Sequence, residues 1–166
     1  MSENINLMSL FRKRPQAMVE IKGSPDYPDI SGNVYFYKIR QGVIVISVIY
    51  SLPKPTTQCS EPVLGFHIHS GAACTGNDAD YFSNALGHYN PQNCPHPYHA
   101  GDLPPLFSAN GTAFSAFLTD RFTVEEVIGK TVIIHSMPDD FTTQPAGNSG
   151  VRIACGEIIS LNNKRL

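Results

Sequence analysis

Apolar positions along the chain fall into short runs that alternate with polar residues or continue for a few positions, a pattern typical of β-strands. The alternation is clearest in Val34–Tyr37 and Val43–Tyr50. β-Branched and aromatic residues dominate the runs, while Gly, Pro and Asn collect between them. The pattern predicts strands at Ala17–Lys22, Asn33–Ile39, Gly42–Leu52, Leu64–His69, Thr112–Thr119, Thr131–His135 and Cys155–Leu161.

Two long stretches, Gly71–Asn110 and Ser136–Val151, are too rich in Gly, Pro and Asn to form strands. Loops of this length inside a compact domain usually carry function. Between them, the sequence Thr123-Val124-Glu125-Glu126 has the pattern of a capping box and predicts a short helix from about Val124 to Ile128. We therefore expect an all-β domain with a single core and two functional loops.

The N-terminal residues differ from the rest of the chain. A short amphipathic helix is predicted there, ending before Pro15, from the spacing of Ile5, Leu7, Met8, Leu10 and Phe11. We expect residues 1–16 to form an extension and residues 17–166 to form the domain. An early acidic residue and an interrupted apolar stretch do not match a signal peptide, so the sequence predicts a cytoplasmic protein without a membrane span.

The charge balance limits the partners of the protein. The net charge is −2, and no basic run exceeds Arg12-Lys13-Arg14. A nucleic-acid-binding domain usually has a basic face, so we expect neither a nucleic-acid nor a membrane partner.

All six histidines lie between His67 and His135, where a metal site could use them. Imidazole is the commonest neutral metal ligand in proteins. His67 and His69 belong to one predicted strand, and residues two apart project from the same face. His135 ends a second strand, and His88 follows a glycine in a loop. Four such nitrogens suit Cu(II).

A second set of ligands lies in the long loop. His96, His99 and Asp102 fall within seven residues, and with His88 they would give the three imidazoles and one carboxylate that suit tetrahedral zinc. Either His-x-His or His-Pro-Tyr-His alone is usually an ordinary polar sequence. Both sets require His88, whose two ring nitrogens could bridge two ions.

Together these segments resemble the copper/zinc superoxide dismutase family. The sequences GFHIH, GHYNP, HAGDL, VIIH-x-x-x-D and GNSGVRIACG occur in the order of that family, and the resemblance extends over roughly residues 17–160. It implies a Greek-key β-sandwich, or flattened barrel, of about eight antiparallel strands. It also implies the conversion of superoxide to dioxygen and hydrogen peroxide by alternate reduction and reoxidation of copper.

The resemblance implies a role for each matching residue. Copper ligands would be His67, His69, His88 and His135, and zinc ligands would be His88, His96, His99 and Asp102. Arg152 would draw in the anion, and His88 would detach from reduced copper and carry a proton. Asp139 would link one copper ligand to one zinc ligand, and Cys74 would form a disulfide with Cys155.

Two features depart from the family pattern. The stretch from His96 to His99 is shorter than in the familiar eukaryotic members, and so is Ser136–Val151, which contains no Lys or Arg. Steering of superoxide by charges in that loop is therefore in doubt. The resemblance assigns no role to Cys59 and Cys94. They could be free thiols or form a second disulfide, or Cys94 could be a spare metal ligand.

Several alternatives stay open at this point. A metal-binding module without redox activity, or a structural β-sandwich with incidental histidines, would be separated from an enzyme by metal content. The implied disulfide fits an oxidising compartment better than the cytoplasm, so export is a second reading of the location. The resemblance allows a homodimer without fixing the oligomeric state, because members of the family dimerise through different faces and some are monomers.

Overall fold

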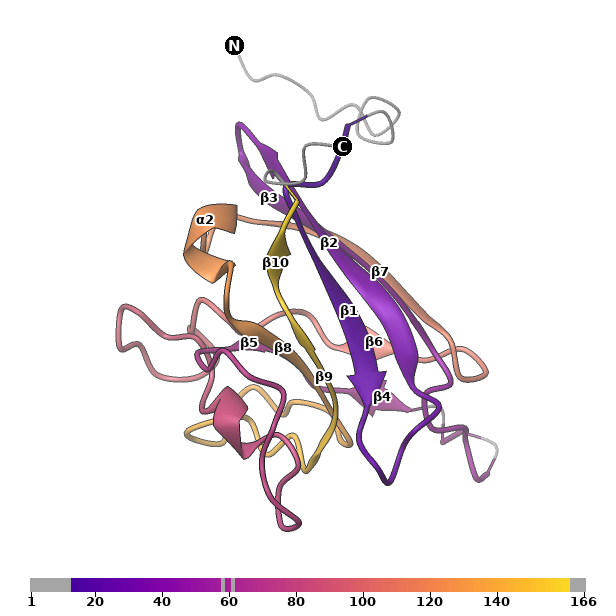
Figure 1. Ribbon diagram of the computed structural model, residues 1–166. Helices are drawn as coiled ribbons and strands as arrows, with labels where there is room; N and C mark the ends of the chain where they lie inside the picture. The colour runs from indigo at the N-terminus through magenta and orange to yellow at the C-terminus, as the bar shows by residue number, and fades with distance from the viewer. Residues whose placement is uncertain (1–12, 58, 61, 162–166) are drawn as a thin grey trace.

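An antiparallel sheet that curls into a half-barrel forms the body of the molecule (Figure 1). The computed structural model describes residues 13–161, apart from 58 and 61. The strands along the chain are β1 (Ala17–Gly23), β2 (Ser31–Ile39), β3 (Gly42–Tyr50), β4 (Val63–Leu64), β5 (Phe66–His69), β6 (Leu106–Phe107), β7 (Ala113–Thr119), β8 (Thr131–His135), β9 (Arg152–Glu157) and β10 (Ile159–Ser160).

The order of the strands brings distant segments together. The main sheet runs β5-β8-β9-β1-β2-β3-β7, with β10 also paired to β1, and β4 pairs with β6 in a separate two-stranded sheet. The chain leaves β3 near one edge and enters β5 at the other, and this long crossover fits the expected Greek key. The expectation of about eight antiparallel strands is confirmed.

Two of the predicted strands are each interrupted at one residue in the structure. The expected strand Leu64–His69 is divided at Gly65, whose N–H donates to the Met137 carbonyl and whose carbonyl accepts from the His135 N–H. The last strand begins earlier than expected, at Arg152, and is interrupted at Ile158. In both places the backbone bonds to a neighbouring turn or loop instead of continuing the ladder.

The first predicted loop contains short regular elements, and the predicted helix is present. The stretch 71–110 contains β6 and the 3-10 helix η1 (Ser83–Ala85), so it is less irregular than its composition suggests. The predicted helix is α2 (Val124–Val127), with the capping box confirmed, because the Thr123 side chain accepts from the Glu126 N–H and the Glu126 carboxylate accepts from the Thr123 N–H. The expected N-terminal helix lies outside the described residues.

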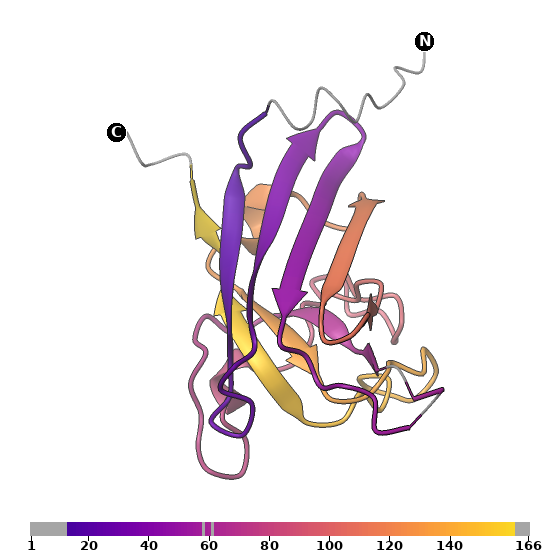
Figure 2. The same ribbon diagram turned by 90° about the vertical axis from the view of Figure 1, so that its right-hand side faces the viewer.

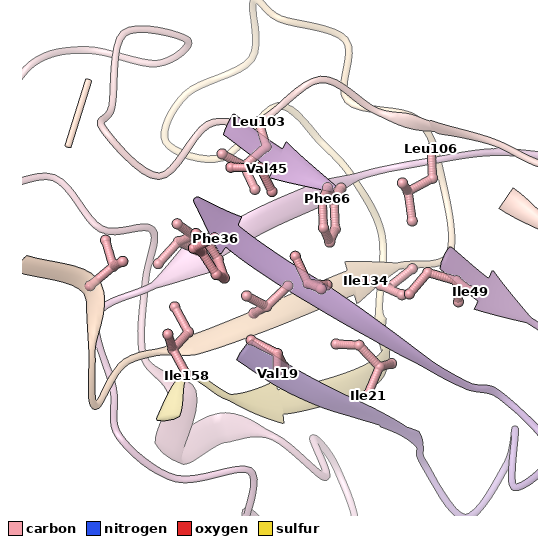
Figure 3. Close-up of a cluster of buried hydrophobic side chains, with 14 of the residues drawn as sticks. Val19, Ile21, Phe36, Val45, Ile49, Phe66, Leu103, Leu106, Ile134 and Ile158 are labelled. Atoms are coloured by element: carbon pink, nitrogen blue, oxygen red, sulfur yellow. The ribbon is translucent and has the colours of Figure 1, made fainter. Parts of the chain in front are cut away.

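The hydrophobic core fills the inside of the curled sheet. Figure 3 shows Val19, Ile21, Phe36 and Val45 from one half of the sheet facing Phe66 and Ile134 from the other. These side chains are at most 2% exposed, as expected from the alternation along each strand. Burying a large apolar side chain stabilises the fold by about 1.5–3 kcal/mol, so this packing holds β5 and β8 rigidly.

A second, smaller cluster lies on the outer side of β8 and β9. Phe82 and Ala85, from the loop after β5, pack there against Ile133 and Cys155. A disulfide between Cys74 and Cys155, with Cα atoms 5.6 Å apart, ties the same loop to β9. The pairing implied by the family resemblance is confirmed, and Cys59 and Cys94 are free thiols.

Within the described residues, no helix has the length and apolar character that a membrane crossing requires. The division into an extension of 16 residues and a domain from residue 17 stays a prediction.

Loss of the disulfide should lower the stability of the protein. Its cysteines are separated by 81 positions, and the chain-entropy model gives about 4.5 kcal/mol for a loop of that size. We expect the double variant Cys74→Ser/Cys155→Ser to lose about 4 kcal/mol of unfolding free energy in denaturant titrations. The matched control Cys59→Ser/Cys94→Ser should be near wild type. A loss below about 1 kcal/mol in the first variant would contradict the prediction.

Candidate metal centre

The strands place three of the six histidines. In β5 the alternation turns Phe66 and Ile68 into the core, so His67 and His69 project from the opposite face. His135 is the last residue of β8, which pairs with β5. His88 comes from the loop and forms an isolated bridge with His69. Ligand atoms of these four side chains lie within 4.8 Å of one another.

Hydrogen bonds determine which nitrogen of each imidazole in this first set is free. The Nε2–H of His67 donates to the Asp139 carboxylate at 2.8 Å, and the Nδ1–H of His69 donates to the Leu86 carbonyl at 2.8 Å. The Nδ1–H of His135 donates to the Gly150 carbonyl at 3.3 Å. We assign these tautomers from their oxygen acceptors, and the remaining nitrogens keep their lone pairs for a metal.

The second set is His88, His96, His99 and Asp102, again with ligand atoms within 4.8 Å. The Asp102 carboxylate lies 2.7 Å from His88 Nδ1, 3.3 Å from His99 Nδ1 and 3.1 Å from His96 Nδ1. All four side chains are at most 8% exposed. Three imidazole nitrogens around one carboxylate form the donor set that zinc prefers.

His88 belongs to both sets, as predicted from the sequence. Its Nδ1 faces Asp102, while its Nε2 is buried without a hydrogen-bond partner. His67 Nδ1 is buried and unpartnered as well, and its ring centroid lies 4.0 Å from that of His88. Buried nitrogens are rarely left unpaired, so these two atoms fit a bound ion. The first set, with nitrogen donors alone, suits copper.

Asp139 connects the two sets. One carboxylate oxygen accepts from His67 Nε2 at 2.8 Å and the other from His96 Nε2 at 2.9 Å, and both histidine side chains are fully buried. Burial would raise the pKa of Asp139, but hydrogen bonds from His67, Phe141 and His96 outweigh it and lower the pKa. The carboxylate therefore stays ionised and fixes both rings.

Arg152 lies beside the first set. It stands opposite His135 in the pairing of β8 with β9, where the register shifts. Its guanidinium donates to the Phe82 and Leu86 carbonyls, each at 2.6 Å, so it shares the Leu86 oxygen with His69. The Asp80 carboxylate lies 3.3 Å from the guanidinium and offsets part of its charge. No motif in the sequence predicts this acidic partner.

Three further residues shape the site, and only one of them, Gly147, lies in a motif of the family resemblance, GNSGVRIACG. The Arg121 guanidinium donates to the carbonyls of Pro97, His99 and Asp102. The Gln144 side chain bonds both backbone groups of His96. A Cβ at Gly147 would lie 2.0 Å from an Asp139 oxygen, so only glycine allows that carboxylate to approach.

Burial keeps four of the histidines neutral. Together with the neighbouring His67, it lowers the pKa of His135 to about 3. Burial also lowers the pKa of His69, His67 and His99. A neutral imidazole is the form that binds a metal, so the site is prepared for ions at neutral pH.

The protein has two buried ligand sets that share one histidine, and an antiparallel half-barrel carries them. These features place it in the class of β-proteins that bind two metal ions. The family model of copper/zinc superoxide dismutase (SODC) matches residues 30–158. A copper–zinc superoxide dismutase of Legionella pneumophila is 36% identical over 139 residues, which cover 79% of each chain. The chain therefore belongs to the copper/zinc superoxide dismutase family.

Other relatives agree. The copper–zinc superoxide dismutase of Photobacterium leiognathi is 38% identical over 57% of this chain and 62% of its own, so the match spans less than two thirds of that relative. A superoxide dismutase-like protein of Bacillus subtilis is 35% identical over 58% of its length. The structure of the Cu/Zn superoxide dismutase from Brucella abortus shares the fold, with a TM-score of 0.71 at 23% identity over 85% of this chain and 98% of that one.

The metal-free protein should lose stability as the pH falls. Four buried histidines have a lowered pKa in the folded state, so the unfolded chain takes up more protons below its ordinary value of 6.5. Their contribution is complete above that value and is lost at lower pH. The lowered pKa of Asp102 and Asp139 adds a loss near pH 4. We expect calorimetry to show the Tm falling continuously from pH 7 to about 4. A constant Tm would contradict this.

Proposed function

We propose that the protein is a copper/zinc superoxide dismutase enzyme. Two superoxide anions and two protons become one dioxygen and one hydrogen peroxide, the reaction of this family. The observation that carries the proposal is His88, whose two ring nitrogens face two different sets of buried ligands. A structural protein would have no reason to bury six imidazoles in this way.

The ligand assignment follows from the free nitrogens. Copper would be held by His67 Nδ1 and by the Nε2 atoms of His69, His88 and His135. Zinc would be held by the Nδ1 atoms of His88, His96 and His99 and by the Asp102 carboxylate. Bound in these places, copper supplies a one-electron couple between Cu(II) and Cu(I), and zinc supplies a fixed positive charge.

The chain itself supplies a charge and a proton site. Arg152 carries a permanent positive charge beside the first set, and its two carbonyl bonds hold it in place for an incoming anion. The buried Nε2 of His88 can hold a proton, while Asp102 keeps the Nδ1 side of the ring fixed. Asp139 holds His67 and His96 in the tautomers that the two ions need.

The location of the enzyme remains a prediction. The Cys74–Cys155 disulfide favours an oxidising compartment.

Metal analysis of the purified protein, together with a superoxide assay, tests the function directly. We expect one copper and one zinc per chain and dismutase activity. Zinc alone without activity would favour a metal-binding module, and no metal would favour a structural protein.

Copper and zinc ligands should respond differently to substitution. His135→Ala should leave a folded, zinc-containing protein with negligible dismutase activity, because only the first set loses a nitrogen. Asp102→Ala should instead remove zinc and lower the Tm, because metal binding to the native site stabilises it by mass action. Metal content, Tm and activity of the two variants provide the measurement. Full activity in His135→Ala, or one zinc per chain in Asp102→Ala, would overturn the assignment concerned.

Anion guidance should depend mainly on Arg152, since the loop 136–151 contains no Lys or Arg. Arg152→Ala should reduce kcat/KM several-fold or more. Salt should slow the wild type, because exposed charges are screened over about 10 Å at 0.1 M ionic strength. Most of that salt effect should disappear in the variant.

The control for this experiment is Lys38→Ala, which removes one exposed cation from an ion pair on β2 and should leave both rate and salt dependence unchanged. If Arg152→Ala kept the wild-type salt dependence, other cations would be guiding the anion.

A further inference from the structure

The carboxylate of Asp80 is held in a fixed position beside Arg152. One of its oxygens accepts a hydrogen bond from the Phe82 N–H at 3.0 Å, and the other lies 3.3 Å from Arg152 Nη1. The backbone of Asp80 is fixed as well, because it exchanges hydrogen bonds with the backbone of Asn77, whose side chain also accepts from the Asp80 N–H. Figure 2 shows the loop that carries Asp80 beside the start of β9, where Arg152 stands. Asp80 is therefore a permanent neighbour of the guanidinium.

Backbone carbonyls, rather than Asp80, hold the Arg152 guanidinium in place. Its bonds to the Phe82 and Leu86 carbonyls are both 2.6 Å long, whereas 3.3 Å separates it from the carboxylate. Phe82 packs in the small cluster against β8 and β9, and the disulfide ties the same loop to β9. Loss of the Asp80 charge would therefore leave the guanidinium where it is. It would change the electric field that the guanidinium presents to an incoming ion.

A negative charge at this position weakens the attraction of anions by Arg152. The side chain of Arg152 is 19% exposed and that of Asp80 is 39% exposed, so both charges act on ions in solution. The two residues line one cavity together with the carboxylates of Asp26 and Asp78, and among the described residues that line it Arg152 is the only cation. An anion that approaches from this side therefore meets a guanidinium whose charge is largely offset.

We propose that Asp80 is a specificity-determining residue, which makes the centre accept monovalent anions and reject multivalent ones. The inference rests on the proposed function, because superoxide is the monovalent anion concerned. An unshielded guanidinium binds phosphates and carboxylates well, and such ions would compete with superoxide. The Coulomb energy of an ion in a given field is proportional to its charge. A carboxylate beside the guanidinium therefore costs a divalent anion twice as much as it costs superoxide, and it favours the smaller charge.

Anion binding to the copper- and zinc-loaded protein tests the proposal, with azide as the monovalent probe and sulfate as the divalent probe. Azide bound to Cu(II) changes the absorption spectrum, and sulfate is measured by its displacement of azide at constant ionic strength. Asp80→Asn removes the charge and keeps a side-chain oxygen for the Phe82 N–H. A unit charge within about 7 Å in water-like surroundings changes the affinity for a monovalent ion by about threefold.

We therefore expect the Kd of azide to fall about threefold in Asp80→Asn and the inhibition constant of sulfate to fall about tenfold, the square of the first factor. The kcat/KM for superoxide at low salt should rise, and its salt dependence should become steeper, as for other charges at the edge of a binding site. A residue that only held Arg152 in position would give the opposite sign, because its loss would weaken azide binding. Weaker azide binding, or equal factors for azide and sulfate, would overturn the proposal.

The matched control is Asp78→Asn, which makes the same change of charge two positions earlier in the same loop. Asp78 is exposed and forms no ion pair with Arg152, although both residues are described by the structure. Both anion constants should therefore change clearly less than in Asp80→Asn. Equal changes in the two variants would overturn the proposal, because the effect would then belong to the total charge of the loop.

The azide and sulfate constants also separate this proposal from the proposed function. If the loaded protein bound azide but did not convert superoxide, the proposed function would fail, and the two constants would still decide the role of Asp80. If the wild type and Asp80→Asn were both active dismutases with the same azide and sulfate constants, the role of Asp80 alone would be overturned.

Discussion

The buried carboxylate of Asp139 is the interaction on which the rest of the centre depends. It accepts hydrogen bonds from His67 on a strand and from His96 in a loop, so it couples the rigid half of the site to the irregular half. Without an acceptor for these N–H groups, neither ring would have a defined tautomer, and neither would direct its free nitrogen inward. Gly147, a backbone position without a side chain, leaves the room that the carboxylate shared by both ligand sets needs.

Strands hold three of the ligands, and a loop holds the others. β5 and β8 hold His67, His69 and His135 against a close-packed core, where a displacement would create a cavity. The remaining ligands lie in a loop that has little regular structure of its own, and that loop is fixed from several sides. The disulfide, the small cluster around Phe82 and the hydrogen bonds of Arg121 each restrain a different part of it.

Much of this centre could be predicted from the sequence, for a physical reason. The period of a strand puts His67 and His69 on one face, and the spacing of His96, His99 and Asp102 is short enough to surround one ion. What could not be predicted depends on contacts between distant segments. Arg121 reaches the backbone of a loop about 20 residues away, and Asp80 approaches Arg152 across more than 70 positions. Neither residue belongs to a local pattern, so only the folded chain reveals their roles.

The sequence of β3 predicts the strand correctly, but it does not predict which faces of the strand are covered. An almost continuous apolar run predicts burial on both faces, as in a sheet covered on each side. Within the described residues the core covers only the inner face, where Ser47 lies, and the outer face is left to Ile46, Val48 and their neighbours. A run of this kind is costly in a monomer, because apolar surface remains in water. Such a run therefore identifies the strand, but it does not show what covers each of its faces: the long loop covers the outer side of β8 and β9, and no described segment covers that of β3 in the same way.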